Sequence, residues 1–282
     1  MTIAKKILIG CGGLLGILLV GLGIIYFISP FYSVAGVPVL NYHQVNDQYR
    51  TCLTMSTADF ETQMDFLKKE GYNSISPTEL YNYLENGAEL PEKPILITFD
   101  DGYIDNYQQA YPIMKKYGYR GTIFIITGFV APNGRYLDWP MIEEMSKNGF
   151  TFESHTVNHK PLRNVDAETL KRELIDSKAT IEEHTGIPCD FIAYPEGSYN
   201  GTVLAETKAT GYVGGFTVDT GRADRGDSLY TLERIPVFEG AHQLWHFRFR
   251  LRMTMVTDWL WGMRNYMRDQ LHWDVAKKIP LP

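Results

Sequence analysis

Short apolar runs alternate with amphipathic segments along most of the chain from residue 37 onward. The apolar runs are rich in Val, Ile and Phe, which is typical of buried strands. Between them, apolar residues recur every three or four positions, which predicts helices that bury one face. A strand followed by a helix, repeated many times, is the pattern of a parallel sheet built from βα units. The number of repeats favours a barrel over a small open sheet.

The expected elements can be placed by residue number. Strands are predicted at residues 37–42, 93–99, 121–127, 150–154, 191–195 and 213–218. Helices are predicted at residues 56–71, 76–87, 103–117, 140–148, 167–184 and 201–210. The first two helices carry start signals, because Ser56 stands three residues before Asp59 and Ser76 three residues before Glu79, as in a capping box.

The N-terminal segment has a different pattern. Residues 7–28 form an uncharged apolar run of 22 residues, long enough to cross a bilayer as a helix. Lys5 and Lys6 on its short N-terminal side predict that this end is cytoplasmic and that the rest of the chain is extracytoplasmic. Residues 33–35 resemble a signal-peptide cleavage site, but the run is longer than a usual signal core. We therefore expect an uncleaved, single-pass anchor in the cell membrane, with a cleaved signal peptide as the alternative.

Composition suits one folded domain beyond this anchor, since 44% of residues are hydrophobic and 21% are charged. The expected organisation is a cytoplasmic tip and anchor at residues 1–30, a globular domain at 31–246 and a tail at 247–282. The tail mixes arginines with aromatic residues, so it can pack on the barrel or lie on a membrane surface. Cys52 and Cys189 follow the anchor, and the sequence leaves open whether they form a disulfide or stay free.

The formal net charge is −6. The chain has no arginine-rich arm, paired-cysteine finger or basic recognition helix, so nucleic-acid binding is not expected.

Two adjacent carboxylates, Asp100 and Asp101, stand directly after an apolar run and directly before Gly102. The carboxyl ends of strands in a barrel form the face where ligands bind, so both residues are predicted at the functional end. An Asp-Gly pair is also common in turns, which is the alternative for the dipeptide alone. Adjacent carboxylates repel one another, and a bound cation relieves that repulsion.

Metal ligands of a second type follow another predicted strand. His155 and His159 are four residues apart, a spacing that in helical or turn-like backbone places both imidazoles on one side. Two imidazole nitrogens and one carboxylate oxygen leave a coordination position open for water, which is the usual arrangement of a hydrolytic Zn²⁺. The histidine pair and Asp101 together therefore predict a metal site.

These two motifs carry a family resemblance. "TFDDG" (residues 98–102) and "SHTVNH" (residues 154–159) resemble the first two motifs of the polysaccharide deacetylases, the NodB-homology or carbohydrate esterase 4 family. The resemblance begins near "PVLNYHQV" and ends near "ERIPV", with its motif core at residues 92–240. It implies a distorted (β/α) barrel of the NodB type as the catalytic domain.

The same resemblance implies a role for each motif residue. Asp101, His155 and His159 would hold a divalent metal, with Zn²⁺ expected and Co²⁺ or Ni²⁺ as alternatives. Asp100 would be the general base that takes a proton from the attacking water. The reaction would be hydrolysis of an acetamide, with a backbone N–H facing the oxyanion.

Two later motifs depart from the family pattern. In "AYPEG", many members carry arginine where Ala193 stands and tyrosine where Glu196 stands. The backbone amide of Glu196 can still face the oxyanion, because it does not depend on the side chain. The usual late Leu-x-His motif has no convincing match. His43 in "LNYH" resembles the proton donor of the biofilm-polysaccharide branch, and a histidine that ties down the first βα loop is the alternative.

Further residues are candidates for supporting roles. His242 and His246 are the next candidates for the proton donor. Asp219, Arg222 and Arg234 are candidates for shaping the site, with a structural ion pair as the alternative for Arg234. Stacking on sugar rings is a candidate role for two aromatic residues that could equally belong to the core, Trp139 and Tyr194.

The function implied by the resemblance is a polysaccharide N-deacetylase, a metal-dependent hydrolase that removes N-acetyl groups from N-acetylglucosamine units. The preferred substrate is the biofilm polymer poly-β-1,6-N-acetylglucosamine, because of His43 and "AYP", and a peptidoglycan or chitin-like polymer is the alternative. A non-catalytic glycan-binding relative is the alternative from another class. The expected partners are the polysaccharide and, through residues 7–28, a membrane, and the chain is expected to be a monomer.

Overall fold

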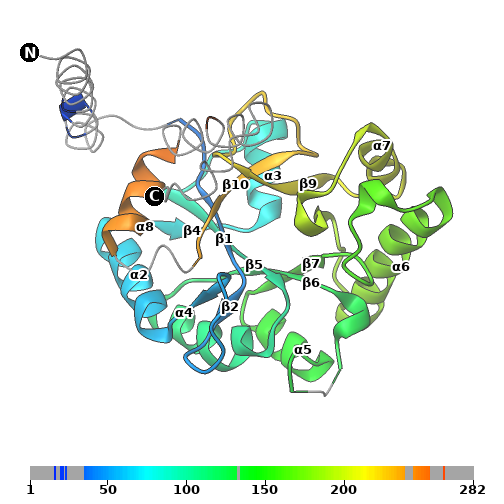
Figure 1. Cartoon of the computed structure of the whole chain (residues 1–282), viewed down its shortest axis with the longest axis horizontal. Coiled ribbons are helices and arrows are strands. Elements are labelled where there is room, and N and C mark those ends of the chain that lie inside the picture. Colours follow the sequence, from blue (N-terminus) through cyan, green and yellow to red (C-terminus); the bar gives the residue numbers. More distant parts are fainter. Residues whose placement is uncertain are drawn as a thin grey trace, which may run out of the picture.

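Seven parallel strands close into a barrel in the computed structural model, which describes residues 35–131, 134–238 and 244–254 and, singly, residues 16, 20, 21, 23 and 263 (Figure 1). The strands follow the order β1-β10-β9-β8-β7-β6-β5, and β5 pairs with β1 to complete the ring. The barrel strands are β1 (Val39–Tyr42), β5 (Pro94–Asp101), β6 (Thr122–Ile125), β7 (Thr151–Ser154), β8 (Phe191–Ala193), β9 (Gly214–Thr220) and β10 (Leu232–Pro236). The predicted parallel (β/α) barrel is confirmed.

Three strands outside the ring are only two residues long. β4 (Asn73–Ser74) pairs with the first residues of β5, before the part of β5 that pairs with β1. β2 (Gln44–Val45) and β3 (Thr54–Met55) pair with each other beyond the carboxyl end of β1. These short strands were not predicted, because two residues are too few to show the alternation of apolar and polar positions. β10 was not predicted either, because its buried Arg234 interrupts the apolar pattern.

Helices surround the barrel (Figure 1). They are α2 (Thr57–Glu70), α3 (Pro77–Asn86), α4 (Tyr111–Tyr117), α5 (Trp139–Lys147), α6 (Ala167–Thr185), α7 (Gly201–Ala209) and α8 (Leu244–Arg252). The predicted start signals are confirmed, since the Ser56 side chain accepts from Asp59 N and Ser76 forms a complete capping box with Glu79. A π-helical turn, η2 (Asn106–Ala110), precedes α4, and 3₁₀ turns form at η3 (Thr127–Phe129), η4 (Leu162–Asn164) and η5 (Pro195–Gly197).

Buried strand residues alternate between two apolar clusters. One contains Val39 and Leu96, together with residues of β6, β8, β9 and β10 and Leu80 of α3, and fills the barrel. The other contains Leu40 and Ile97, together with helix residues such as Phe60, and lies between the barrel and its helices. This period-two alternation is what a strand buried on both faces produces. The barrel strands are therefore buried on both faces.

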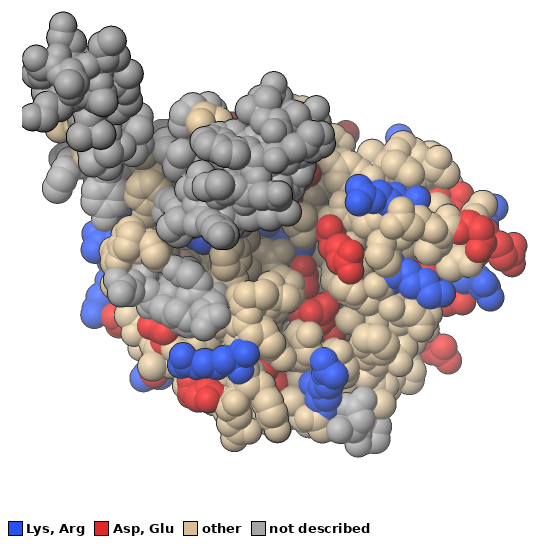
Figure 2. Space-filling view, viewed as in Figure 1, with Lys and Arg blue, Asp and Glu red and all other residues tan. Residues whose placement is uncertain are grey.

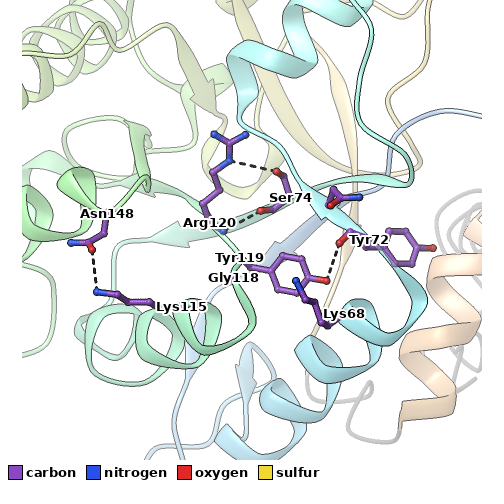
Figure 3. Close-up of a pocket in the computed structure, with 9 residues that line it drawn as sticks. Lys68, Tyr72, Ser74, Lys115, Gly118, Tyr119, Arg120 and Asn148 are labelled. Atoms are coloured by element: carbon purple, nitrogen blue, oxygen red, sulfur yellow. Dashed lines mark hydrogen bonds between the residues drawn. The ribbon is translucent and has the colours of Figure 1, made fainter.

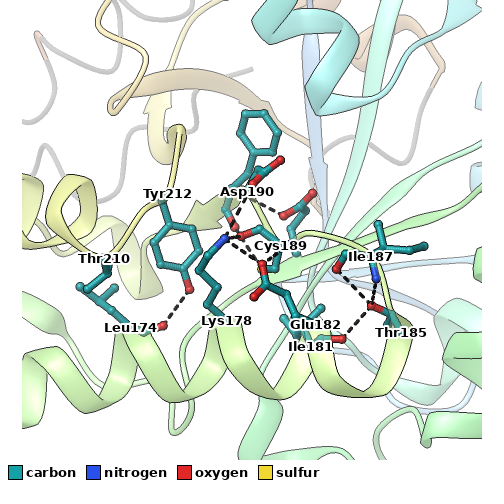
Figure 4. A network of polar contacts seen from close by, with 12 residues as sticks. Leu174, Lys178, Ile181, Glu182, Thr185, Ile187, Cys189, Asp190, Thr210 and Tyr212 are labelled. Atoms are coloured by element: carbon teal, nitrogen blue, oxygen red, sulfur yellow. Dashed lines mark hydrogen bonds and ion pairs between the residues drawn. The ribbon is translucent and has the colours of Figure 1, made fainter.

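Polar contacts join the elements at the N-terminal ends of the strands. Around one depression there, the Tyr119 hydroxyl donates to Tyr72 O and Lys115 Nζ donates to Asn148 Oδ1 (Figure 3). Under α6, Lys178 Nζ donates to Cys189 O and lies 3.0 Å from a Glu182 carboxylate oxygen (Figure 4). These contacts hold the end of the barrel that lies opposite the predicted metal ligands.

The first part of the C-terminal tail packs on the barrel. Phe247 of α8 is buried and meets the Phe66 ring of α2 edge-on, and Arg250 Nη1 donates to Pro236 O. α8 starts at Leu244 and so crosses the expected domain boundary at residue 246, because the apolar residues that dock it lie on both sides of that boundary. Residues 255–262 and 264–282 lie outside the described part of the chain.

Two other expectations concern the termini and the cysteines. The predicted anchor at residues 7–28 lies outside the described residues except for residues 16, 20, 21 and 23, and no helix in the described part is both long and apolar enough to cross a membrane. Cys52 and Cys189 are both free thiols, the first exposed and the second buried. The disulfide that the sequence left open does not form in this structure.

Candidate active site

A cavity of about 400 Å³ opens at the carboxyl ends of the barrel strands. Each predicted catalytic and metal-binding residue lines it, although they come from four different strand ends. These residues are His43 after β1, Asp100 and Asp101 at the end of β5, His155 and His159 after β7, and Glu196 after β8. Asn41 and Arg234 also contribute to its wall. The fold therefore brings together candidate residues from four separate sequence motifs.

Asp101, His155 and His159 form a cluster with the donor set of a metal site. Asp101 Oδ1 lies 3.4 Å from His155 Nε2 and 3.4 Å from His159 Nε2, and the three ligand atoms all lie within 4.8 Å of one another. Ligand atoms bound at about 2.1 Å around a tetrahedral Zn²⁺ lie about 3.4 Å apart. The donor chemistry and the distances from Asp101 both fit a divalent cation.

The backbone around this cluster is unusual. Asp101 has φ 73°, Thr156 φ 67°, His159 φ 55° and Glu196 φ 55°. The left-handed region disfavours residues with a Cβ, so such positions persist only where the surrounding structure holds them. Four of the five described non-glycine residues with positive φ border the cavity or its histidine loop. Because the turn after β5 is left-handed, Asp101 departs from the strand alternation that directs Asp100 inward.

A hydrogen bond fixes the orientation of the His155 ring. His155 Nδ1 lies 2.7 Å from Ala193 O, and a carbonyl oxygen can only accept, so Nδ1 carries the proton. The Nε2 lone pair is then free to face Asp101 and a cation. Metal-binding histidines are commonly oriented by a partner of this kind.

The loop between His155 and His159 is held from beneath by Glu173 of α6. This buried carboxylate accepts from the backbone N–H groups of Val157 and Asn158 at 2.9 and 2.8 Å, and from Asn158 Nδ2 at 2.9 Å. On the other side, Gly128 N donates to Val157 O, and a Cβ at Gly128 would stand 2.5 Å from that oxygen. The loop can lie this close to η3 only because residue 128 is glycine.

Asp100 sits apart from the metal cluster, in a buried ion pair. Arg234 Nη1 donates to Asp100 Oδ1 and Nη2 to Asp100 Oδ2, each at 2.7 Å, and Asn41 Nδ2 donates to Oδ2 at 3.2 Å. Burial is the largest single influence and would raise the pKa of Asp100, but the Arg234 guanidinium together with His155 and His43 outweighs it, so that pKa lies well below its usual range. Asp100 is therefore an ionised carboxylate that is positioned without help from a metal.

Comparison with known proteins decides the family. The polysaccharide deacetylase family model matches residues 87–215. Protein YxkH of Bacillus subtilis, which is named as a member of that family, is 36% identical over 206 residues, covering 73% of each chain. The chain belongs to the polysaccharide deacetylase family.

Two further proteins refine this placement. Poly-β-1,6-N-acetyl-D-glucosamine N-deacetylase of Staphylococcus aureus is 30% identical over 203 residues, covering 67% of this chain and 70% of that protein. Among solved structures, Streptococcus pyogenes deacetylase PplD in complex with acetate matches with a TM-score of 0.70 and 32% identity, covering 73% of this chain and 94% of PplD. The (β/α) barrel is thus the NodB-type barrel of a hydrolase family.

Two further predicted residues, His43 and Glu196, line the cavity. His43 is half-buried, and burial lowers its pKa whereas the carboxylates of Asp100 and Asp101 act in the opposite direction. The Glu196 side chain is exposed, and its positive φ turns the chain at the cavity wall. Both residues lie where they can meet a bound substrate.

Other candidates from the sequence lie elsewhere. Tyr194 is fully buried in the core, so its ring is not available to a sugar. Trp139 stacks on His184 at a centroid distance of 3.9 Å and does not line the cavity. Arg222 donates to the backbone carbonyls of Gly36 and Leu251. Asp219 and His246 do not line the cavity either. Asp219 accepts from the Tyr199 hydroxyl, and His246 lies on α8. His242 lies outside the described residues.

Charge on the surface gives no further indication of the ligand. Lys and Arg are interspersed with Asp and Glu over the described residues on the face shown in Figure 2. Two further acidic groups, Asp100 and Asp101, are buried inside the cavity.

Proposed function

We propose that this protein is a metal-dependent hydrolase that removes N-acetyl groups from N-acetylglucosamine units of an extracellular polysaccharide, with poly-β-1,6-N-acetylglucosamine as the substrate. The observation that carries the proposal is the pairing of a two-histidine, one-aspartate cluster with a separate, ionised Asp100 in one cavity. The similarity to the S. aureus enzyme over most of both chains supports the choice of polymer.

Asp101, His155 and His159 are the residues that would hold the cation, and we propose Zn²⁺, with Co²⁺ or Ni²⁺ as alternatives. A bound divalent cation would lower the pKa of a water molecule and would polarise a carbonyl oxygen. The protein contributes the orientation of the ligands, through Ala193 O behind His155 and Glu173 behind the loop that carries His159.

Asp100 is the proposed general base. Arg234 holds both of its oxygens, so the carboxylate cannot rotate away from the cavity. Asp100 Oδ2 accepts from both Arg234 and Asn41, whereas Oδ1 accepts from Arg234 alone and keeps a lone pair for a water molecule. Through Oδ1, Asp100 would take a proton from this water as the water attacks the acetyl carbonyl carbon. Asp100 and Asp101 are adjacent in sequence but would have different tasks, since Asp101 is committed to the cation.

His43 and Glu196 are proposed to act later in the reaction. His43 would act in its protonated form, which the carboxylates of Asp100 and Asp101 favour and burial opposes. It would donate that proton to the amine of the glucosamine as the C–N bond breaks, which releases acetate. The Glu196 backbone N–H would donate to the oxyanion that forms on the acetyl carbon. Both residues line the same cavity as Asp100.

The location of the enzyme is part of the proposal. Residues 7–28 would anchor the chain in the cell membrane, and the barrel would lie on the extracytoplasmic side, where the polymer is found. The support for this is the uncharged apolar run and the two lysines that precede it.

Acetate release tests the proposed function. The full chain in detergent would be loaded with Zn²⁺, Co²⁺ or Ni²⁺ and assayed on β-1,6- and β-1,4-linked N-acetylglucosamine oligomers. Release from the β-1,6 oligomer should fall by about 10²–10⁴-fold in Asp100→Asn, while the metal content stays at the wild-type level. Asp176→Asn, which changes an exposed carboxylate on α6, should keep full activity.

The other outcomes have distinct meanings. Acetate from the β-1,4 oligomer alone would assign a peptidoglycan or chitin-like substrate. Bound metal without acetate from any oligomer would refute the enzyme and leave a glycan-binding relative.

A further inference from the structure

A second cavity, of about 690 Å³, lies beside the candidate active site. Three stretches of chain contribute to both cavities. His43 lines the first and Gln44 the second, Asp101 lines the first and Tyr103 the second, and the loop before β3 places Leu53 in the first and Thr51 in the second. The two cavities therefore adjoin along one side of the barrel end.

The loop that forms one wall of this second cavity is tied to the barrel. Asn46 Nδ2 donates to Asp105 Oδ2 at 2.8 Å, and Val45 N donates to Asp105 Oδ1. Thr57 at the start of α2 donates to the Asp47 carboxylate through its backbone N–H and its hydroxyl. Both carboxylates in the cavity wall are thus occupied by contacts within the protein, and the loop is held in place before any ligand arrives.

The opposite wall contains the aromatic Tyr103 and is also held by contacts within the protein. The Tyr103 ring stacks on Tyr136 at a centroid distance of 5.2 Å and an interplanar angle of 17°. Backbone bonds from Ile104 N to Arg135 O and from Leu137 N to Gly102 O join the two segments. This wall therefore offers a fixed ring and peptide surface.

Besides the Arg135 guanidinium, which lies over the Tyr136 ring at 5.4 Å from its centroid, the groups that face a ligand are uncharged amides and one exposed ring. The side chains of Gln48, Gln108 and Gln109 line the cavity, are exposed and form no hydrogen bond with other described residues. Gln108 and Gln109 lie on the π-helical turn η2, a conformation that is rare and often found at functional sites. Tyr49 is 73% exposed although its ring is large and mostly apolar.

We propose that this second cavity is a subsite that binds a neighbouring sugar unit of the polysaccharide chain; the proposal rests on the proposed function. Amide side chains can donate to and accept from sugar hydroxyls without a charge to desolvate. A tyrosine ring presents an apolar face, which can stack on the apolar face of a pyranose. A polymer unit in the first cavity would place its neighbour in the second, because the two adjoin.

Chain-length dependence tests the subsite. With the metal-loaded full chain, kcat and KM would be measured for Tyr49→Ala, Gln108→Ala and wild type on the shortest β-1,6-linked oligomer that wild type deacetylates and on the hexamer. We expect each variant to raise KM for the hexamer by roughly tenfold, the loss of one stacking or hydrogen-bonding contact. We expect kcat to change little and the shortest oligomer to be processed as by wild type. Tyr49→Phe, which keeps the ring, should behave as wild type.

Direct binding separates failure of the subsite from failure of the proposed function. If wild type releases acetate and the variants match it on every oligomer, the subsite is refuted while the function stands. If wild type releases no acetate, the function fails, and calorimetric titration with the β-1,6 hexamer then decides the subsite. Binding to wild type that is lost in Tyr49→Ala would support the subsite, and binding that is equal in both, or absent from both, would overturn it.

Discussion

The two sides of the candidate active site are built in different ways. On the base side, Asp100 and Arg234 lie on barrel strands and meet as a buried ion pair across 134 residues of sequence. On the metal side, His155 and His159 lie four residues apart on a loop that contains two left-handed residues. The base side thus depends on how distant strands pair, and the metal side depends on local backbone that neighbouring elements hold in place. The two sides should therefore fail differently when a supporting residue is removed.

The largest expected effect is on the base side. Arg234→Met would leave the Asp100 carboxylate buried without its partner, since the two side chains are 1% and 3% exposed. Breaking one half of a buried pair costs about 3–5 kcal/mol, so the free energy of unfolding should fall by that amount in urea titrations. Activity should be lost as well, because Asp100 is no longer held.

A double variant sharpens this result. Arg234→Met combined with Asp100→Asn removes the buried charge, so the double variant should be more stable than Arg234→Met alone. Metal content should stay near the wild-type level in both. If Arg234→Met instead loses its metal and keeps its stability, the two sides of the site are not separate, and the comparison fails.

The contrast also explains what the sequence could predict. The candidate metal ligands could be predicted because each motif is a short contiguous stretch at the end of a strong apolar strand, and Asp100 because it neighbours Asp101. Arg234 was only one candidate among several. It pairs with Asp100 because the barrel brings their strands together, and no sequence spacing predicts that pairing. Nothing in the sequence indicated a role for Asn41 beyond its place next to "YH", although its side chain donates to Asp100.

Glu173 and Gly128, which hold the histidine loop in place, were missed for a related reason. Glu173 belongs to an amphipathic helix whose pattern predicts an exposed face, and only the packing of α6 against the histidine loop buries it. Gly128 looked like an ordinary residue at a strand end, and its role depends on the approach of Val157 O. The roles of both residues depend on contacts between segments that are distant in sequence, and hydrophobic periodicity does not predict such contacts.

The next effect in size tests the local backbone of the metal side. Gly128→Ala would place a Cβ 2.5 Å from Val157 O, so the loop that carries His159 has to shift. Overpacking of this kind costs about 1–3 kcal/mol, measurable as a lower melting temperature. Zn²⁺ affinity should fall as well. Gly201→Ala is the matched control, because a Cβ there meets nothing within 4 Å, and it should behave as wild type.

The smallest effect comes from a change that keeps the shape of the histidine loop. Glu173→Gln has the same size as the original side chain, and its amide oxygen can still accept from the N–H groups of Val157 and Asn158, which bond to a carboxylate in the wild type. The amide nitrogen that replaces the other oxygen cannot accept from Asn158 Nδ2, so that one bond is lost. Hydrogen bonds to a neutral acceptor are weaker than those to a charged one, so the loop should be held less firmly. Replacing partners behind a metal ligand typically lowers metal affinity by about 10–100-fold, which competition with a chelator would measure. The Asp100–Arg234 pair makes no contact with Glu173, so activity at saturating metal should recover. Activity that stays low at saturating metal would show that the loop also positions the substrate, and the metal side would then do more than hold a cation.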